Sequence, residues 1–176
     1  MAASLDTDQA AVDRVTATML RDLFADGDFS ASLDGGEPIL DASERSHMSD
    51  VGGLVRVLAA VELSAIVVLL VSAWLLRRER ERRARLVLRA ALGVGGVALM
   101  LGIFFAVAFD TAFASFHALF FQEGTWQFGP ESNLIRLFPE PFWFETSLLA
   151  GLSIVLGAGL AAWVARRRRG SGPAEA

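Results

Sequence analysis

The chain has 176 residues, of which 53% are hydrophobic, with a mean hydropathy of +0.45. Its formal net charge is −4 and all sixteen basic residues are arginine. Cysteine is absent, which excludes disulfides and thiolate chemistry. The apolar residues gather in three blocks of roughly the length that crosses a bilayer, so the composition predicts an integral membrane protein. We expect membrane lipid as a partner and no nucleic acid.

The first predicted element is an amphipathic helix over residues 8–25. Thr7 or Asp8 is its candidate cap, and Asp26 begins a stop signal. Residues 29–38, rich in glycine, acids and serine, predict a loop or a short hairpin. The apolar side chains of the helix recur at helical spacing, at Val12, Val15, Met19 and Leu23. This pattern predicts a helix at the surface of the protein.

The next stretch, residues 40–58, carries His47, one of the two histidines, about ten residues before the first apolar block. If this stretch is helical, Glu44, His47 and Asp50 lie roughly on one side of the helix. A carboxylate within hydrogen-bond reach would orient the imidazole and raise its pKa. The alternative is a polar interfacial turn in which the acids are present by chance.

Three apolar blocks follow, at about residues 57–76, 86–109 and 146–165. Each approaches the ~20 residues that span the hydrocarbon core, and only helices satisfy the backbone there. The fold class is therefore predicted to be all-α, a polytopic membrane helix bundle with three transmembrane helices. Glu62 lies inside the first block, where a lone carboxylate is costly, so we expect it to face the bundle interior. Whether it is functional or only tolerated near the interface stays open.

Charge divides the chain by membrane side. Arginine clusters at residues 77–85 and 166–169 follow the first and third blocks, and basic segments stay on the cytoplasmic side. We therefore predict an extracytoplasmic N-terminal segment over residues 1–56, a transmembrane bundle over 57–165 and a cytoplasmic tail over 166–176. Nothing near Met1 resembles an export signal, so either a short acidic tail crosses the membrane unaided or a further apolar segment lies upstream, and we expect the second.

Residues 110–144 form a predicted extracytoplasmic aromatic loop. Residues 104–144 hold 11 of the 13 phenylalanines, which fits an interfacial belt better than a ligand box. His117 lies here, two helical turns after Asp110, either in a continuation of the second span or in a helix that restarts with Asp110 as its cap. A short interfacial helix is predicted around Arg136. Prolines are expected to end it, at Pro139 and Pro141.

The two histidines are the candidate catalytic residues. His47 and His117 fall on the same predicted side of the membrane, with Glu44, Asp50, Asp110 and Glu62 as candidate supporting residues. If the imidazoles meet, one can accept a proton while the other donates one or stabilises an oxyanion. The same groups are also compatible with a metal site, although the pattern is permissive. Ser115 carries no nucleophile signature, and no cofactor is predicted.

The motifs SERSHMSDV at residues 43–51, FHALFF, W-x-F and LFPEPFW resemble the bacterial membrane family of lipoprotein intramolecular transacylases (Lit). The resemblance covers roughly residues 40–165. It implies four transmembrane helices, of which this chain lacks the first. It also implies transfer of an acyl chain from the diacylglyceryl group of a lipoprotein to the α-amine of its N-terminal cysteine. The two essential histidines of the family would correspond to His47 and His117.

The sequence thus favours a membrane acyltransferase with lipoprotein substrates and an extracytoplasmic site in the cell membrane. We predict His117 as the base and His47 as the acid or oxyanion partner, although the assignment could be reversed. The alternatives are a noncatalytic protein that binds lipid or a partner through the aromatic loop, and a metal-dependent membrane hydrolase. The sequence does not indicate an oligomeric state.

Overall fold

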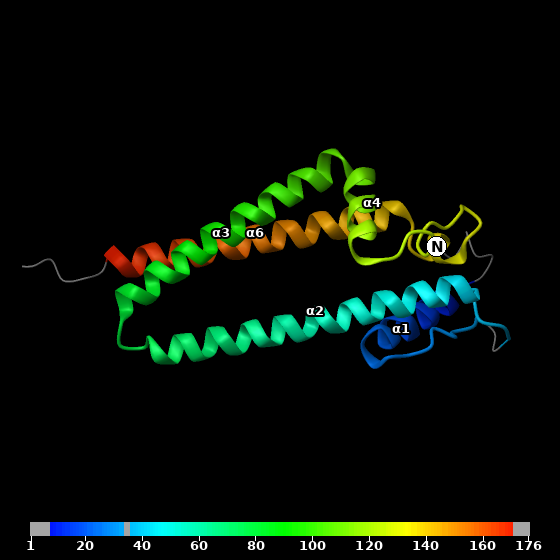
Figure 1. Ribbon diagram of the computed structural model, residues 1–176, viewed down its shortest axis with the longest axis horizontal. Coiled ribbons are helices and arrows are strands. Elements are labelled where there is room, and N and C mark those ends of the chain that lie inside the picture. The colour runs from blue at the N-terminus through cyan, green and yellow to red at the C-terminus, as the bar shows by residue number, and fades with distance from the viewer. Residues whose placement is uncertain (1–7, 34–35, 171–176) are drawn as a thin grey trace, which may run out of the picture. The chain divides into compact units, whose positions relative to one another are not determined.

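The structure, a computed structural model, describes residues 8–33 and 36–170. These residues are all-helical and contain no strand, as predicted (Figure 1). The helices are α1 (Gln9–Ala25), α2 (Ala42–Leu75), α3 (Arg80–Val107), α4 (Phe109–Phe120), α5 (Asn133–Leu137) and α6 (Glu140–Gly170). Thr7, Gly35 and the last part of the predicted tail lie outside the described residues.

The three longest helices, α2, α3 and α6, are apolar and long enough to cross a membrane. Their apolar side chains point outward, and Leu69 and Leu70 are 67% and 66% exposed. So much exposed apolar surface is unfavourable in water and suits lipid. The three predicted spans are confirmed, and the chain is a multi-pass membrane protein. Each helix extends beyond its apolar block because the polar flanks continue the same hydrogen-bonded backbone.

Two helix boundaries differ from the prediction. The chain breaks at Ala108 and α4 restarts at Phe109, so Asp110 lies in the first turn of α4 and is not its cap. Pro141 was expected to end a helix, but it lies in the first turn of α6. A proline is tolerated there because the first backbone N–H groups of a helix have no partner within the helix.

The chain folds into two compact units. The first consists of Met1–Leu63 and Phe113–Trp143, and the second consists of Ser64–Ala112 and Phe144–Ala176. Both histidines therefore belong to the first unit. The predicted division at residues 56 and 165 concerns the sides of the membrane and stays a prediction.

In the second unit, α3 and α6 run side by side (Figure 1). A Cβ on Gly95 would lie 3.0 Å from Ala158, and one on Gly151 would lie 3.8 Å from Gly102. Small residues at these positions let the two helices approach closely.

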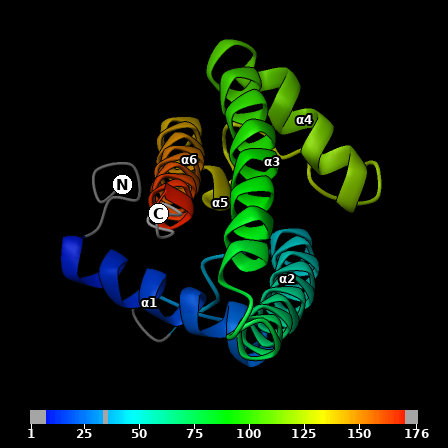
Figure 2. The same ribbon diagram turned by 90° about the vertical axis from the view of Figure 1, so that its left-hand side faces the viewer.

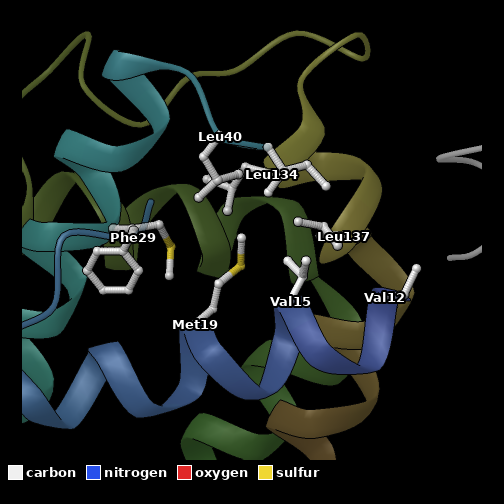
Figure 3. Packing of buried hydrophobic residues seen from close by; sticks show 9 residues of the cluster. Val12, Val15, Met19, Phe29, Leu40, Leu134 and Leu137 are labelled. Atoms are coloured by element: carbon white, nitrogen blue, oxygen red, sulfur yellow. The ribbon is translucent and has the colours of Figure 1, made fainter. Parts of the chain in front are cut away.

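The first unit has its own hydrophobic core, which α1 covers. Asp8 caps this helix by accepting a hydrogen bond from the Ala11 N–H, and the helix ends at Asp26 in the left-handed conformation. Figure 2 shows α1 lying crosswise to α2, with the C-terminal end of α1 beside α2. The predicted apolar face of α1 is buried and points toward α5 and the start of α2 (Figure 3). The labelled core residues are Val12, Val15, Met19, Phe29, Leu40, Leu134 and Leu137.

Candidate functional site

Hydrogen bonds hold the segment around α5 against the N-terminus of α2. The carboxylate of Glu44, which is 2% exposed, accepts from the Ser132 hydroxyl and, at 3.0 Å, from the Leu134 N–H. Its other oxygen accepts from the Asp41 N–H at 2.8 Å. The Asn133 side-chain amide donates to the Ile39 carbonyl at 2.7 Å. These bonds join two segments about ninety residues apart.

The structure therefore corrects the expected role of Glu44. We predicted that Glu44 or Asp50 orients His47, but both oxygens of Glu44 bind the backbone and the Ser132 hydroxyl. Buried N–H groups near a helix start need acceptors, and a carboxylate is a strong one. Glu44 is a structural clamp that fixes the loop next to His47.

The two histidines lie close together in the same unit. The rings of His47 in α2 and His117 in α4 have centroids 6.0 Å apart and planes inclined at 27°. His47 is buried, with 6% of its surface exposed, whereas His117 is half-buried. Both rings are thus close enough to contact the same small chemical group.

Aromatic side chains surround this pair and form what we call the aromatic cluster. Phe121 contacts both rings, with centroids 4.9 Å from His47 and 5.5 Å from His117. The Trp126 ring lies 4.9 Å from His117. The cluster consists of Phe113, Phe116, Phe121, Trp126 and Phe128. Rings packed in this way lower the local polarity around the imidazoles and restrict access of water.

A backbone hydrogen bond sets the tautomer of His117. Its Nδ1 lies 2.8 Å from the Phe113 carbonyl oxygen. A carbonyl only accepts, so Nδ1 carries the hydrogen, and in the neutral ring Nε2 keeps a lone pair. His117 is thereby prepared to accept a proton at Nε2.

His47 lies in different surroundings. Its Nδ1 is buried and has no hydrogen-bond partner within the described residues. Burial, followed by the effect of His117, lowers the pKa of His47 below its usual value of 6.5, and Asp50 acts in the opposite direction. A carboxylate thus raises this pKa as expected, but the loss of hydration has the larger effect.

Burial also lowers the pKa of His117, although its bond to Phe113 acts in the opposite direction. His47 lies in the first turns of α2, about ten residues before its apolar block, and His117 lies in α4, which is not one of the three candidate spans. Two neutral imidazoles at neutral pH follow from these shifts. One can therefore act as a base without first losing a proton.

The other three predicted supporting residues are all exposed. Asp50 is exposed one turn after His47, and Glu62 is exposed in the apolar part of α2. Asp110 is exposed and belongs to the second unit. The supporting roles of these three acids stay predictions. In the described part of the chain, no three His, Asp or Glu side chains gather as a metal site.

Trp126 is a polar group of the site that the sequence reasoning did not single out. Its Nε1 is buried and has no partner among the described residues, and its ring packs on His117. A buried N–H usually finds an acceptor, so an unpaired one beside a candidate base indicates a place for a ligand oxygen. The W-x-F motif includes this residue, but the motif alone does not indicate a chemical role for it.

These features define an all-α, multi-pass membrane protein with a histidine pair enclosed by aromatic side chains. The chain belongs to the lipoprotein intramolecular transacylase (Lit) family, since the profile of this family matches residues 12–143, most of the chain. The match includes both histidines and confirms the resemblance noted in the motifs. Searches among curated proteins and among solved structures found no significant match. Family membership connects the chain with lipoprotein transacylation.

Proposed function

We propose that this protein moves an acyl chain from the diacylglyceryl group of a lipoprotein to the α-amine of the N-terminal cysteine of the same lipoprotein. The observation that carries the proposal is the pairing of His47 with His117, whose Nε2 is available as a base. Family membership supports the same reaction class.

The reaction needs a proton to move from nitrogen to oxygen. The α-ammonium has an ordinary pKa of about 7.7–8.0 and must lose a proton before it attacks the ester carbonyl. This first proton is released to water. The neutral amine then attacks, a C–N bond forms, and His117 accepts the second proton that leaves the nitrogen. The C–O bond to glycerol breaks and His117 passes this second proton to the glyceryl oxygen, so the products are a neutral amide and a free hydroxyl. His47 stabilises the oxyanion or assists this transfer.

Two properties of the site fit a transfer within one substrate molecule. The ester and the amine arrive together, so proximity replaces a covalent enzyme intermediate. The aromatic cluster limits water near the histidines, and water would otherwise release the fatty acid. A serine or cysteine nucleophile is then unnecessary.

We further propose that the site lies on the extracytoplasmic side of the cell membrane. The arginine clusters between α2 and α3 and at the end of α6 favour a cytoplasmic position for those helix ends. The opposite end of α2 carries His47. Membrane lipid and lipoproteins are the partners that this position offers.

Purified protein in nanodiscs and a synthetic diacylglyceryl lipopeptide test the proposed reaction. Intramolecular transfer leaves the mass of the lipopeptide unchanged, but it consumes the free amine. We expect loss of amine-reactive labelling and an N-acyl cysteine in tandem mass spectrometry. Release of free fatty acid would point to a hydrolase instead, and an unchanged lipopeptide would favour a noncatalytic lipid-binding protein.

We propose that the Trp126 N–H donates to the oxygen of the reacting carbonyl. Trp126→Phe keeps a ring against His117 and removes the donor, so the turnover rate should fall by about 10- to 100-fold. Trp143→Phe is the matched control because the Trp143 N–H already donates to Phe138, at 3.0 Å. Equal rates for the two variants would exclude this role for Trp126.

The pH dependence of turnover should report the histidine pair. Because burial lowers both pKa values, the bases stay neutral until the pH falls below the ordinary value of 6.5. We expect a rate plateau near neutrality and a decline on the acid side with an apparent midpoint below 6.5, measured at saturating lipopeptide. A midpoint above 6.5 would contradict the assignment of the base to this buried pair.

A further inference from the structure

The second unit contains a basic pocket at the ends of its helices. Its volume is about 690 Å³, and it lies between the start of α3 and the end of α6. Its walls combine charged and small apolar side chains from Arg77, Arg80, Glu81, Arg83, Ala84, Val87, Val164, Ala165, Arg168 and Arg169. We call this the arginine pocket, and it is separate from the histidine pair in the first unit.

Helical spacing explains how the pocket forms. Arg80, Arg83 and Val87 share one face of α3, since they are three and four residues apart. Ala84 and Ala165 are buried, at 6% and 3% exposure, so small side chains form the floor. The longer arginine side chains then extend around a space that no aliphatic side chain fills.

The pocket has an unbalanced positive charge. Its one carboxylate, Glu81, forms an ion pair with Arg85, which does not line the pocket. Arg82, also outside it, pairs with Glu79. Within the described residues no carboxylate pairs with the four arginines that α3 and α6 contribute, which are Arg80, Arg83, Arg168 and Arg169. Several guanidinium groups around one space repel each other unless an anion lies between them.

We propose that the arginine pocket binds the phosphate of an anionic phospholipid headgroup. Guanidinium groups bind phosphate oxygens in a bidentate manner, and several can share one phosphate. Val87 and Val164 continue the lining into the apolar parts of α3 and α6, where acyl chains can follow. Basic pockets between transmembrane helices on the cytoplasmic side bind such headgroups in other membrane proteins. The inference is independent of the proposed acyl transfer.

Native mass spectrometry tests this proposal with protein from nanodiscs of phosphatidylcholine, with and without phosphatidylglycerol. We expect retained phosphatidylglycerol and a higher unfolding temperature in its presence. The double variant Arg80→Gln/Arg168→Gln should weaken this binding by about 30-fold, since each arginine near an anionic lipid contributes about fivefold. The double variant Arg78→Gln/Arg166→Gln removes the same charge outside the pocket and should retain the lipid.

Three results would overturn the proposal. Equal loss of binding in both double variants would indicate diffuse surface charge. Equal stabilisation by inorganic phosphate in phosphatidylcholine nanodiscs would indicate a site for a free anion. Wild-type protein that retains no phosphatidylglycerol would exclude the site directly, whether or not the variants fold.

Discussion

Replacing His117 by alanine is expected to lower the rate of acyl transfer by about 10²- to 10⁴-fold, the usual contribution of a general base. The hydrogen bond from His117 Nδ1 to the Phe113 carbonyl fixes the lone pair at Nε2. Of the two histidines, only His117 has its Nδ1 bound to a backbone carbonyl within the described residues, and alanine removes this imidazole. Single-turnover rates with saturating lipopeptide measure the effect apart from binding.

Ser115→Ala is the matched control for His117→Ala. Ser115 lies two residues away in the same helix, α4, and is the nearest serine to the base in sequence. If the histidine acts directly on the substrate amine, removal of this hydroxyl leaves the rate within about twofold of wild type. Loss of activity in Ser115→Ala, with activity kept in His117→Ala, would replace the proposed mechanism by one with a serine nucleophile.

Replacing Glu44 by alanine is expected to destabilise the first unit by about 1.5–3 kcal/mol. The substitution removes the acceptor of the Ser132, Leu134 and Asp41 hydrogen bonds. It leaves the Leu134 N–H buried without a partner, and the segment that holds α5 against α2 loosens. A lower unfolding temperature and faster hydrogen exchange in residues 132–138 measure this effect.

Glu131→Ala is the control for Glu44→Ala. Glu131 pairs with Arg136 at 2.7 Å, but its side chain is 89% exposed, so water replaces most of that interaction. We expect a change in stability close to zero for this variant. If both variants lose the same stability, the buried clamp has no special role and charge alone explains the effect.

The fold was predictable wherever a local pattern determines structure. The apolar blocks are long enough to specify spans, and the spacing from Val12 to Leu23 specifies the buried face of α1. Boundaries were less predictable because proline acts differently inside a helix and in its first turn. Pro141 therefore marked a helix start that was interpreted as a stop.

The site was predictable in its histidines and not in their surroundings. The motifs around His47 and His117 indicated a pair, and the structure brings their rings within 6.0 Å. The role of Glu44 depends on partners about ninety residues away, and the unpaired N–H of Trp126 depends on packing. Neither feature can be predicted from the spacing of residues along the chain. Local spacing suggested Asp50 as a partner of His47, but burial has the larger effect on the imidazole.

Tandem mass spectrometry of lipoprotein N-termini tests whether this protein transfers the acyl chain in cells. The lipoproteins come from bacteria that lack this activity and express either the wild-type chain or His117→Ala. We expect N-acyl cysteine with a monoacylglyceryl thioether in the first strain and an unmodified α-amine with diacylglyceryl cysteine in the second. The same free amine in both strains, with both proteins present in the membrane, would contradict it.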